Sequence, residues 1–370
     1  MFVVKQLIKM FLQHLILPAV YNFWRLVYSG KNPELIVFAD AHHETLPYSM
    51  KNVYDAIKKK NYQVIEVICD YSRLSQLETF WHAVRFMKLY AQARAVFICD
   101  NFFPVVSCKK SNKTKVVQLW HSCGLLKKMG YDTNEDIPKY YIGNVYKNYD
   151  LVTVSAPACE KYLTRAMRQE EGVVKALGVS RTDTYYDQNW IQFCKNQFYE
   201  KYPQAAGKKV ILWAPTFRGN AADPYQVGIE AVLELEKELG GDYFVIRKVH
   251  PHIEKKYHLS NCEIPSEQLL PIADLMITDY SSIVFDYLFF QKPYVLFAPD
   301  MEEYVDKRGF YVEYDSLSPY IVTEEKELCK NVRSALEKDN KDWLEEQFDY
   351  HISACNGRVT ERILEYLDLL

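Results

Sequence analysis

The sequence lacks the short motifs that mark several large enzyme classes. No two glycines are spaced G-x-G, and there is no G-x-x-x-x-G-K loop, so the glycine-rich phosphate cradles of dinucleotide and nucleoside triphosphate enzymes are missing. The G-x-S-x-G nucleophile elbow and the H-E-x-x-H zinc motif are absent too. There is also no D-x-D, the metal-binding carboxylate pair of many sugar transferases. Neutralising the phosphates of a donor must then fall to Arg, Lys, His and helix termini.

A large excess of charge is also missing. The 45 Lys and Arg residues nearly balance the 48 Asp and Glu residues, and the net charge of −3 gives no reason to expect nucleic acid as a partner. The nine cysteines are odd in number and contain no C-x-x-C pair. We therefore expect a reducing compartment, with the thiols serving as small buried side chains. Neither a metal site nor a bound cofactor is predicted, because clusters of ligand-type residues are missing.

The first 30 residues are strongly apolar but do not look like a membrane span. Their longest charge-free stretch begins at Met10 and ends at Phe23 or Trp24, which is shorter than the ~20 residues that a spanning helix needs. Pro18 breaks its middle, and no small-residue cleavage site follows, so a secretory signal fits poorly. We predict that residues 1–30 form an amphipathic segment lying peripherally on the cytoplasmic face of the cell membrane. The alternative, a helix simply packed on the first domain, stays open.

A length of 370 residues suits two domains, and both halves of the chain alternate apolar runs with helical patterns. The predicted strands are 34–40, 63–69, 95–101, 115–121 and 151–156 in the first half, and 209–215, 243–250, 275–278 and 293–298 in the second. Helices are predicted over 48–59, 74–90 and 227–239. Strands separated by helices predict parallel sheets. We predict an α/β fold with two Rossmann-like domains, 31–195 and 196–370, facing each other across a cleft in a GT-B-like arrangement.

In open α/β sheets, ligands bind beyond the carboxyl ends of the strands. Four predicted strand ends carry suitable side chains: Gln118 to Lys128, Trp213 to Arg218, Ile246 to His252, and Ile277 to Asp286. In the last, Asp279 to Ser282 are predicted to cap a helix over 283–290, whose amino terminus would bind a diphosphate. Asp286 lies four residues after Ser282 and is predicted to hold a hydroxyl of the donor. The plainer interpretation is that these residues only cap a helix.

Two of the nine histidines follow buried strands in different predicted domains, namely His121 and His250. This placement would let two imidazoles face each other across a cleft. An isolated histidine is more often structural than catalytic, and we interpret six others in that way: His42, His43, His82, His252, His258 and His351.

Taken together, these segments resemble a known family. The order of Trp120-His121, Ala214 to Arg218, His250-Pro251, Thr278 to Ser282 and Phe285-Asp286 is similar to that of the CDP-glycerol glycerophosphotransferases of teichoic acid synthesis. The likeness covers roughly residues 35–365. One departure is that the family commonly has His-Gly-Thr-Pro-Leu-Lys, whereas here His121 is followed by Ser122, Cys123 and Gly124.

The resemblance implies transfer of a glycerol phosphate unit from CDP-glycerol to a membrane-linked acceptor, with CMP released. The acceptor would be a lipid-linked glycan or a polyol phosphate. The implied catalytic residues are His121, as general base, and His250, which steadies the diphosphate. The implied donor-binding residues are Trp120, Arg181, Pro215, Thr216, Lys248, Val249, Ser281, Ser282 and Asp286.

Several alternatives stay open. Ribitol could replace glycerol in the donor, and one transfer or a polymer could result. A nucleotide-sugar glycosyltransferase with the same fold, or a catalytically silent membrane scaffold, would share the architecture, because function depends on the site. Release of CMP or of UDP distinguishes the two enzymes, and absence of turnover indicates the scaffold.

Overall fold

The computed structural model describes residues 10–28, 32–137, 141–216, 218–220, 223–249, 251–257 and 262–370. The chain divides into two compact units. Unit 1 lies within Met1–Ser122, Gly130–Asp183 and Ala354–Leu370, and unit 2 comprises Cys123–Met129 and Thr184–Ser353. The division between Asp183 and Thr184 comes earlier than the predicted boundary at 195/196. In addition, Cys123–Met129 belongs to unit 2 and Ala354–Leu370 belongs to unit 1, although each was predicted in the other domain. The predicted GT-B-like arrangement of the two stays a prediction.

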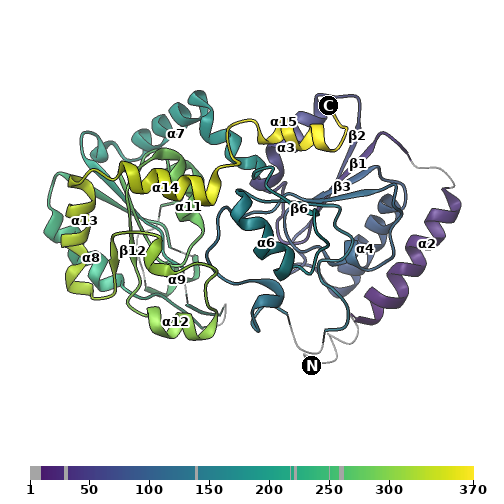
Figure 1. Ribbon diagram of the computed structural model, residues 1–370, viewed down its shortest axis with the longest axis horizontal. Helices are drawn as coiled ribbons and strands as arrows, with labels where there is room; N and C mark the ends of the chain where they lie inside the picture. Colours follow the sequence, from purple (N-terminus) through teal and green to yellow (C-terminus); the bar gives the residue numbers. More distant parts are fainter. Residues whose placement is uncertain are drawn as a thin grey trace. The chain divides into compact units, whose positions relative to one another are not determined.

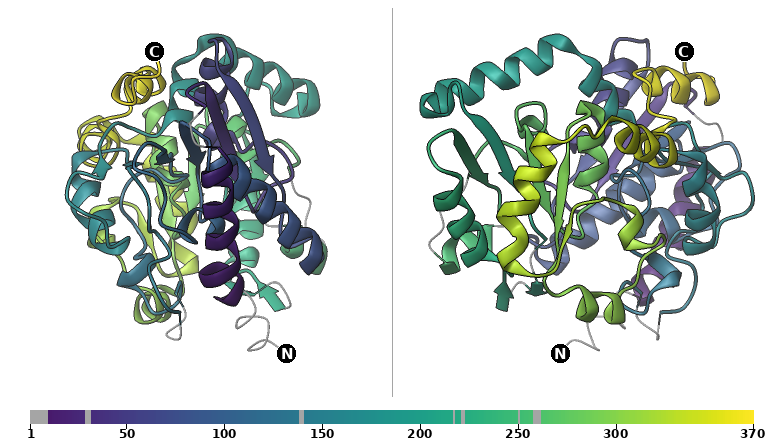
Figure 2. Two further views of the ribbon diagram at one scale, coloured as in Figure 1. Left: turned by 90° about the vertical axis from the view of Figure 1, so that its right-hand side faces the viewer. Right: turned by 60° about the vertical axis from the view of Figure 1, so that its left-hand side comes forward.

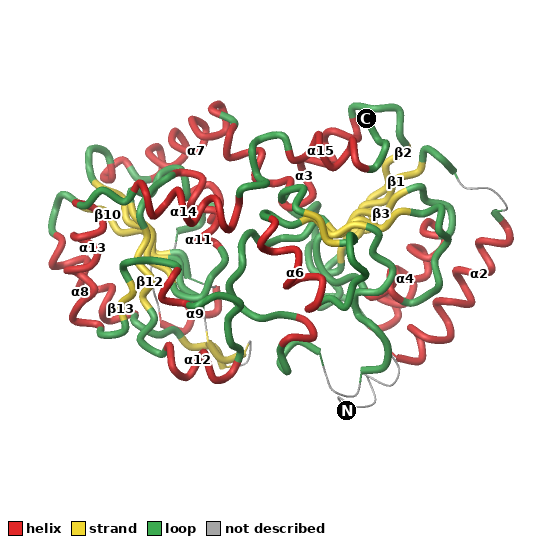
Figure 3. The backbone as a smooth tube through the Cα atoms, in the orientation of Figure 1, coloured by secondary structure: helices red, strands yellow, loops and turns green. Residues whose placement is uncertain are grey.

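Unit 1 is built on a six-stranded sheet, and every strand pair in it is parallel. Figure 3 shows strands in yellow and helices in red. Its strands are β1 (Leu35–Asp40), β2 (Gln63–Ile68), β3 (Ala95–Ile98), β4 (Lys115–Gln118), β5 (Leu151–Thr153) and β6 (Val174–Lys175). They lie in the order β2-β1-β3-β4-β5-β6. The chain therefore changes direction across the sheet between β1 and β3, and such a switch point is where ligands bind in this kind of fold.

The connections of unit 1 are mainly helical, as parallel strands require. They are α3 (Tyr48–Lys58), α4 (Gln76–Tyr90), α5 (Phe103–Val106), η2 (Gly130–Asp132) and α6 (Pro157–Ala166), with α15 (Val359–Tyr366) added by the carboxyl-terminal segment. Helix α4 begins at a full capping box, in which the Ser75 hydroxyl accepts from the Glu78 amide and the Glu78 carboxylate accepts from the Ser75 amide. The η3 turn (Ser180–Tyr186) crosses into unit 2.

The amino-terminal segment forms a π-helical turn, η1 (Leu12–Ile16), followed directly by α2 (Leu17–Val27). Pro18 lacks an amide hydrogen, so the ordinary helical bond to residue 14 cannot form, which accounts for the wider turn before it. Helix α2 packs beside α4 (Figures 1 and 2), with Leu17 and Tyr21 buried. The opposite side exposes large apolar side chains, listed with their exposed fractions: Phe11 56%, Leu15 57%, Phe23 58%, Leu26 79% and Val27 54%. The buried face of this segment is available for packing on unit 1, and the exposed apolar face is available for contact with a membrane.

Unit 2 contains a second parallel sheet, with the order β10-β7-β11-β12-β13. Its strands are β7 (Lys209–Trp213), β10 (Tyr243–Arg247), β11 (Leu275–Thr278), β12 (Tyr294–Phe297) and β13 (Ile321–Val322). A separate antiparallel pair is formed by β8 (Arg218–Asn220) and β9 (Asp223–Tyr225). Relative to chain order, the first five strands of both sheets follow the same pattern. The switch point of unit 2 therefore lies between β7 and β11.

The helical segments of unit 2 cover both faces of this sheet. They are α7 (Gln188–Lys201), η4 (Pro203–Ala205), α8 (Ile229–Leu239), α9 (Pro251–Tyr257), α10 (Ser266–Leu269), α11 (Ile283–Tyr287), η5 (Leu288–Phe290), α12 (Met301–Lys307), η6 (Tyr314–Ser316), η7 (Glu325–Glu327), α13 (Leu328–Glu337) and α14 (Lys341–Ile352). Val232 and Leu235 of α8 and Val332 of α13 pack on Ile211 and Ile277 of the sheet to form one apolar core. Gly240 ends α8 with a positive φ of 77°, as the sequence predicted.

No helix in the described part of the chain is both long enough and apolar enough to cross a membrane. All nine cysteines are free thiols, and seven of them are buried. The predicted strands are found, but most end two or three residues early. The last residues of these predicted strands lie instead in the loops that follow the strands.

Candidate active site

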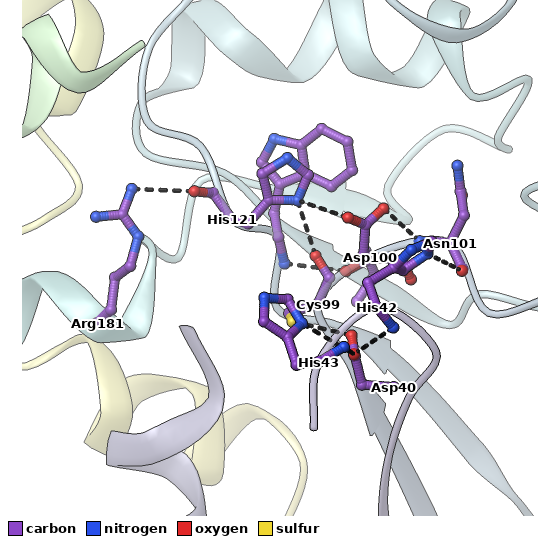
Figure 4. A network of polar contacts seen from close by, with 10 residues as sticks. Asp40, His42, His43, Cys99, Asp100, Asn101, His121 and Arg181 are labelled. Atoms are coloured by element: carbon purple, nitrogen blue, oxygen red, sulfur yellow. Dashed lines mark hydrogen bonds and ion pairs between the residues drawn. The ribbon is translucent and has the colours of Figure 1, made fainter. Parts of the chain in front are cut away.

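Polar side chains gather in unit 1 where β1, β3 and β4 end, beside the switch point (Figure 4). Asp40 is the last residue of β1, Cys99 and Asp100 follow β3, and His121 comes three residues after β4. Because neighbouring parallel strands end at one edge of the sheet, these loops meet there.

His121 has a fixed ring orientation. Its Nδ1 lies 3.0 Å from the carbonyl oxygen of Cys99 and 3.9 Å from a carboxylate oxygen of Asp100. A carbonyl oxygen can only accept, so Nδ1 carries the hydrogen and Nε2 of the neutral ring keeps its lone pair. The side chain is 42% exposed, which leaves it accessible to a substrate. A general base needs an unprotonated ring nitrogen of this kind. The predicted role of His121 as the base stays a prediction.

Trp120 precedes this histidine in an unusual backbone conformation. Its φ is +54°, a backbone conformation that residues other than glycine seldom adopt. The amide of Trp120 donates to the buried side chain of Gln118, and its ring packs on that of His121 with 4.6 Å between centroids. The left-handed turn therefore places Trp120 against the candidate base. Its predicted contact with the donor stays a prediction.

Arg181 also acts on the His121 loop. Its side chain is 7% exposed, and one of its terminal nitrogens donates to the His121 carbonyl at 3.1 Å (Figure 4). The sequence predicted that this guanidinium reaches a phosphate. In the structure it supports the backbone of the candidate base, while a contact with the donor stays a prediction.

The polar residues at the end of β1 were not predicted from the sequence to belong to the site. Asp40 is buried, and one of its carboxylate oxygens accepts from the amides of His42 and His43 and contacts the His43 ring at 2.9 Å. The His42 ring lies 3.1 Å from the carbonyl of Asn101 (Figure 4). His42 and His43 were interpreted as ordinary structural histidines. Their position directly after a predicted buried strand was the signal that could have singled them out.

In unit 2, the loops after β7 and β11 are tied to each other. Thr216, which follows Pro215, donates its amide to a carboxylate oxygen of Asp279 at 2.8 Å. Asp279 also accepts from the Tyr280 amide at 2.7 Å and is only 3% exposed. Asp279 therefore holds the two strand ends together and does not cap the next helix, which differs from the prediction.

Arg218 lies within this buried network. It forms a two-pronged pair with Asp300, at 2.7 and 3.0 Å, and a further ion pair with Asp279 at 3.0 Å. Its guanidinium also lies 4.8 Å from the ring centroid of Tyr280. Burial alone would lower the pKa of Arg218, but the hydrogen bond to Asp300 and the two negative charges raise it above its ordinary value. This arginine is therefore committed to internal partners.

The predicted helix after β11 is present but shorter. Helix α11 ends at Tyr287 and continues as the 3₁₀ turn η5 to Phe290. Ser282 is at its amino terminus without making a side-chain cap, and the Ser281 hydroxyl accepts from the Ile283 amide at 3.4 Å. Both serines are partly exposed, so their predicted contact with a diphosphate stays a prediction.

Asp286 lies buried among residues of unit 2. It is 5% exposed, and one carboxylate oxygen accepts from the Tyr185 hydroxyl at 3.2 Å and from the Cys123 thiol at 3.9 Å. Residues 284–287 are all buried, so the residue four positions after Ser282 points into the unit. The structure therefore gives Asp286 partners within the protein, and its predicted contact with a donor hydroxyl stays a prediction.

The remaining predicted residues follow β10. The Lys248 ammonium donates to the Cys262 carbonyl at 2.7 Å, and Val249 is buried. His250, the second predicted catalytic residue, lies outside the described residues. Its assigned role stays a prediction.

The described residues contain no group of three or more His, Cys, Asp or Glu side chains placed to share a metal ion. The expectation that the chemistry needs neither a metal nor a bound cofactor stays a prediction.

Comparison with known proteins identifies the family of this chain. The model of the family CDP-Glycerol:Poly(glycerophosphate) glycerophosphotransferase matches residues 20–368. The chain belongs to this family. Among relatives of this glycerophosphotransferase family, the teichoic acid ribitol-phosphate primase of Bacillus spizizenii is 29% identical over 90% of both chains. The teichoic acid glycerol-phosphate primase of Bacillus subtilis is 31% identical over 60% of this chain and 61% of its own.

Solved structures show the same fold. The wall teichoic acid polymerase TagF matches with a TM-score of 0.73 at 21% identity, covering 94% of this chain and 93% of that one. A putative UDP-N-acetylglucosamine 2-epimerase from Listeria monocytogenes matches with a TM-score of 0.55 at 12% identity, over 90% and 96% of the two chains. Enzymes with different names therefore share this architecture, and the fold alone does not separate their reactions.

Proposed function

We propose that this protein transfers a polyol phosphate unit from CDP-glycerol or CDP-ribitol to a hydroxyl group of a lipid-linked acceptor, with release of CMP. The product would be teichoic acid or a related cell-surface polymer. The observation that carries this proposal is the family match across residues 20–368. The geometry of His121 adds a residue with the properties of a general base.

In this reaction the acceptor oxygen attacks the phosphorus that bears the polyol, and the bond from that phosphorus to the CMP oxygen breaks. The acceptor hydroxyl loses its proton to Nε2 of His121, which the Cys99 contact leaves unprotonated. Phosphoryl transfer depends mainly on positioning and on neutralising charge. We assign the neutralising role to Lys248, to the Ser281 and Ser282 hydroxyls and, as implied by the resemblance, to His250.

The choice of polyol stays between two candidates. The relatives include both a ribitol-phosphate primase and a glycerol-phosphate primase at nearly equal identity, so sequence identity favours neither. One TagF structure was soaked with CDPG. The loop after His121, where this chain departs from the usual family sequence, is a reason to test both donors.

We place the protein peripherally at the cytoplasmic face of the membrane, on the basis of the exposed apolar face of η1 and α2. Replacing Phe23, Leu26 and Val27 together with serine should reduce flotation with anionic vesicles. These three side chains are more than half exposed, so the fold should persist. Val305→Ser, at an exposed apolar site in unit 2, is the control. Equal flotation of the triple variant and the wild type would contradict the placement.

The direct test is to incubate the purified protein with CDP-glycerol or CDP-ribitol and a lipid-linked disaccharide, and to measure CMP. Release of CMP that depends on the acceptor supports the proposal. Release of UDP from a UDP-sugar would indicate the glycosyltransferase alternative. Absence of turnover with every donor would indicate a silent scaffold.

A further inference from the structure

Two cavities lie next to each other in unit 1, and each has a volume of about 710 Å³. They share three lining residues, namely Tyr71, Ser72 and Phe103. The first, here called the polar cavity, is lined partly by carboxylate, amide and hydroxyl groups. The second, here called the apolar cavity, is lined mainly by hydrocarbon side chains, including Leu12, Leu17, Leu74, Leu77, Phe80 and Ala83.

The polar cavity is linked to the candidate base through residues that contact each other. Asn101 and His42 line it, and the His42 ring contacts the Asn101 carbonyl at 3.1 Å. The Asn101 amide donates to Asp100, whose other carboxylate oxygen lies 3.9 Å from His121 (Figure 4). A ligand in this cavity could therefore present one end toward His121.

The charges around the polar cavity select the kind of group that fits. Asp70 and Asp136 line it, and its described lining contains no Lys or Arg, while Arg73 lies 3.3 Å from Asp70 outside that lining. The hydrogen bonds from Ser72 lower the pKa of Asp70, so this carboxylate is ionised at neutral pH. Carboxylates repel phosphate but accept hydrogen bonds from hydroxyl groups. The polar cavity thus suits a polyhydroxyl group such as a sugar or polyol.

One buried polar atom in this cavity has no partner among the described residues. Gln13 of η1 is 1% exposed, and its amide nitrogen donates to the Tyr141 hydroxyl. The amide oxygen of Gln13 makes no hydrogen bond and is fully buried. An unpaired buried acceptor is unfavourable unless a ligand donor fills it. Because Gln13 also lines the polar cavity, a ligand hydroxyl that displaced the atoms covering this oxygen would complete its hydrogen bonding.

From these observations we infer that unit 1 holds an amphiphile subsite, in which the polar cavity takes the polyhydroxyl head of the acceptor and the apolar cavity takes part of its hydrocarbon chain. The inference rests on the proposed function for the identity of the acceptor. It makes the amino-terminal segment a wall of the acceptor site, in addition to any contact that its exposed face makes with a membrane. Gln13 is a positioning residue in this subsite.

A binding assay tests the subsite without relying on turnover. The probe is n-dodecyl-β-maltoside, used below its micelle concentration and measured by calorimetry, because it joins a sugar head to a hydrocarbon chain. Thr79→Trp places a large side chain into the apolar cavity from α4 and should weaken binding by at least 10-fold. Gln13→Leu removes one neutral hydrogen bond and should weaken binding roughly 2- to 12-fold.

The matched control is Arg85→Trp, which adds the same side chain at an exposed position of α4 that lines neither cavity. It should leave binding unchanged. Leu77→Trp, at a 65% exposed position of the apolar cavity, replaces Thr79→Trp if that variant does not fold. Equal binding by the cavity variants and the control would overturn the inference, as would equal binding of wild type and Gln13→Leu.

Vesicle flotation and turnover complete the test. Thr79→Trp should float like the wild type, because the filled cavity is not the exposed apolar face; loss of flotation would show that the cavity is only part of a membrane-binding surface. Turnover is measured with two acceptors that share one head group and differ in the length of the hydrocarbon chain. Thr79→Trp should raise KM at least 10-fold for the long-chain acceptor and leave KM for the short-chain acceptor unchanged. If the wild type transfers nothing but binds the probe as described, the proposed function fails and the cavity assignment survives.

Discussion

In unit 1 the strand ends beside the switch point carry partly exposed side chains, with His121 at 42% and Asp100 at 35% exposure. In unit 2 the corresponding strand ends carry Arg218 and Asp279, at 7% and 4%, paired with each other and with Asp300. The two sheets share their strand order, so topology does not explain the contrast. His121 and Asp100 therefore remain accessible, whereas Arg218 and Asp279 hold loops in place.

This comparison shows that a strand-end motif does not by itself indicate contact with a substrate. Arg218 and Asp286 belong to conspicuous segments of the sequence, yet both are buried against protein partners. His42 and His43 belong to no such segment but lie in the open site. The exposed fraction and the partners of each side chain separate the two roles.

The largest expected effect is the loss of turnover in His121→Ala, with little change in stability. If His121 is the base, turnover should fall roughly 10²–10⁴-fold while CDP-glycerol still binds. The stability of the protein should change by less than about 0.5 kcal/mol, because the side chain is partly exposed. Steady-state kinetics, donor calorimetry and urea unfolding measure the three quantities. Near-normal turnover would remove His121 from the role of base.

Arg218→Ala should show the opposite pattern, with stability as the main loss. Removing the guanidinium leaves Asp279 and Asp300 with an uncompensated negative charge in a buried setting, which costs about 3–5 kcal/mol. The control is Arg165→Ala in unit 1, where the arginine pairs with Asp132 but is 56% exposed. That loss should be less than about 1 kcal/mol by urea unfolding. Equal losses would remove the distinction between the two strand-end networks.

Acid should destabilise unit 2 through His351. Burial lowers the pKa of this histidine to about 3, and its Nδ1 accepts from the Leu125 amide at 3.2 Å. The unfolded chain binds a proton near pH 6.5 but the folded chain does not, so this contribution to stability is present above pH 6.5 and declines below it. Between pH 7 and pH 5 the loss should be about 2 kcal/mol.

In His351→Gln this part of the pH dependence should disappear. Burial also lowers the pKa of His82 in unit 1, so His82→Gln should act in the same direction. Its effect should be smaller, since His82 is only partly buried. Denaturant unfolding at pH 7 and pH 5 measures both variants. An unchanged pH slope in His351→Gln would show that His351 titrates normally in the folded protein.

The smallest contrast concerns two serines at helix amino termini. Ser75→Ala removes the capping box of α4 and should cost about 1 kcal/mol. Ser282 makes no side-chain cap, so Ser282→Ala should change stability by less than about 0.5 kcal/mol. If Ser282 binds the donor diphosphate, the same variant should weaken CDP-glycerol binding in calorimetry. A stability loss equal to that of Ser75→Ala would return Ser282 to a purely capping role.

Much of the fold was predictable because strongly apolar runs have few alternatives to burial. The long strands were located to within a few residues, and helix 227–239 was found as α8, which begins at Ile229 and ends at Leu239. The strands Val174–Lys175 and Ile321–Val322 were missed, since two residues carry no periodicity. The hairpin of β8 and β9 was missed too, because it lies outside both apolar cores.

The unit boundary shows a further limit. Residues 354–370 return to unit 1, where Gly178 has a φ of +95° and a Cβ placed there would lie 2.4 Å from Val359. The amide of Val359 donates to Asp183 at 2.9 Å. This hydrogen bond joins residues 176 positions apart. Local sequence patterns do not indicate contacts between residues so far apart, so the predicted boundary at 195/196 left residues 354–370 in the second domain.

The sequence by itself determined the fold class and the two parallel sheets, because these depend on local periodicity. Its motifs also indicated the family, and the resemblance to that family implied His121 as the candidate base. Only the tertiary structure decided which strand-end residues remain accessible. Burial and pairing arise from segments distant in sequence: Asp300 joins Arg218, Tyr185 joins Asp286, and Asn101 joins His42. The free energy of a charged side chain depends on those neighbours, and the neighbours exist only once the chain has folded.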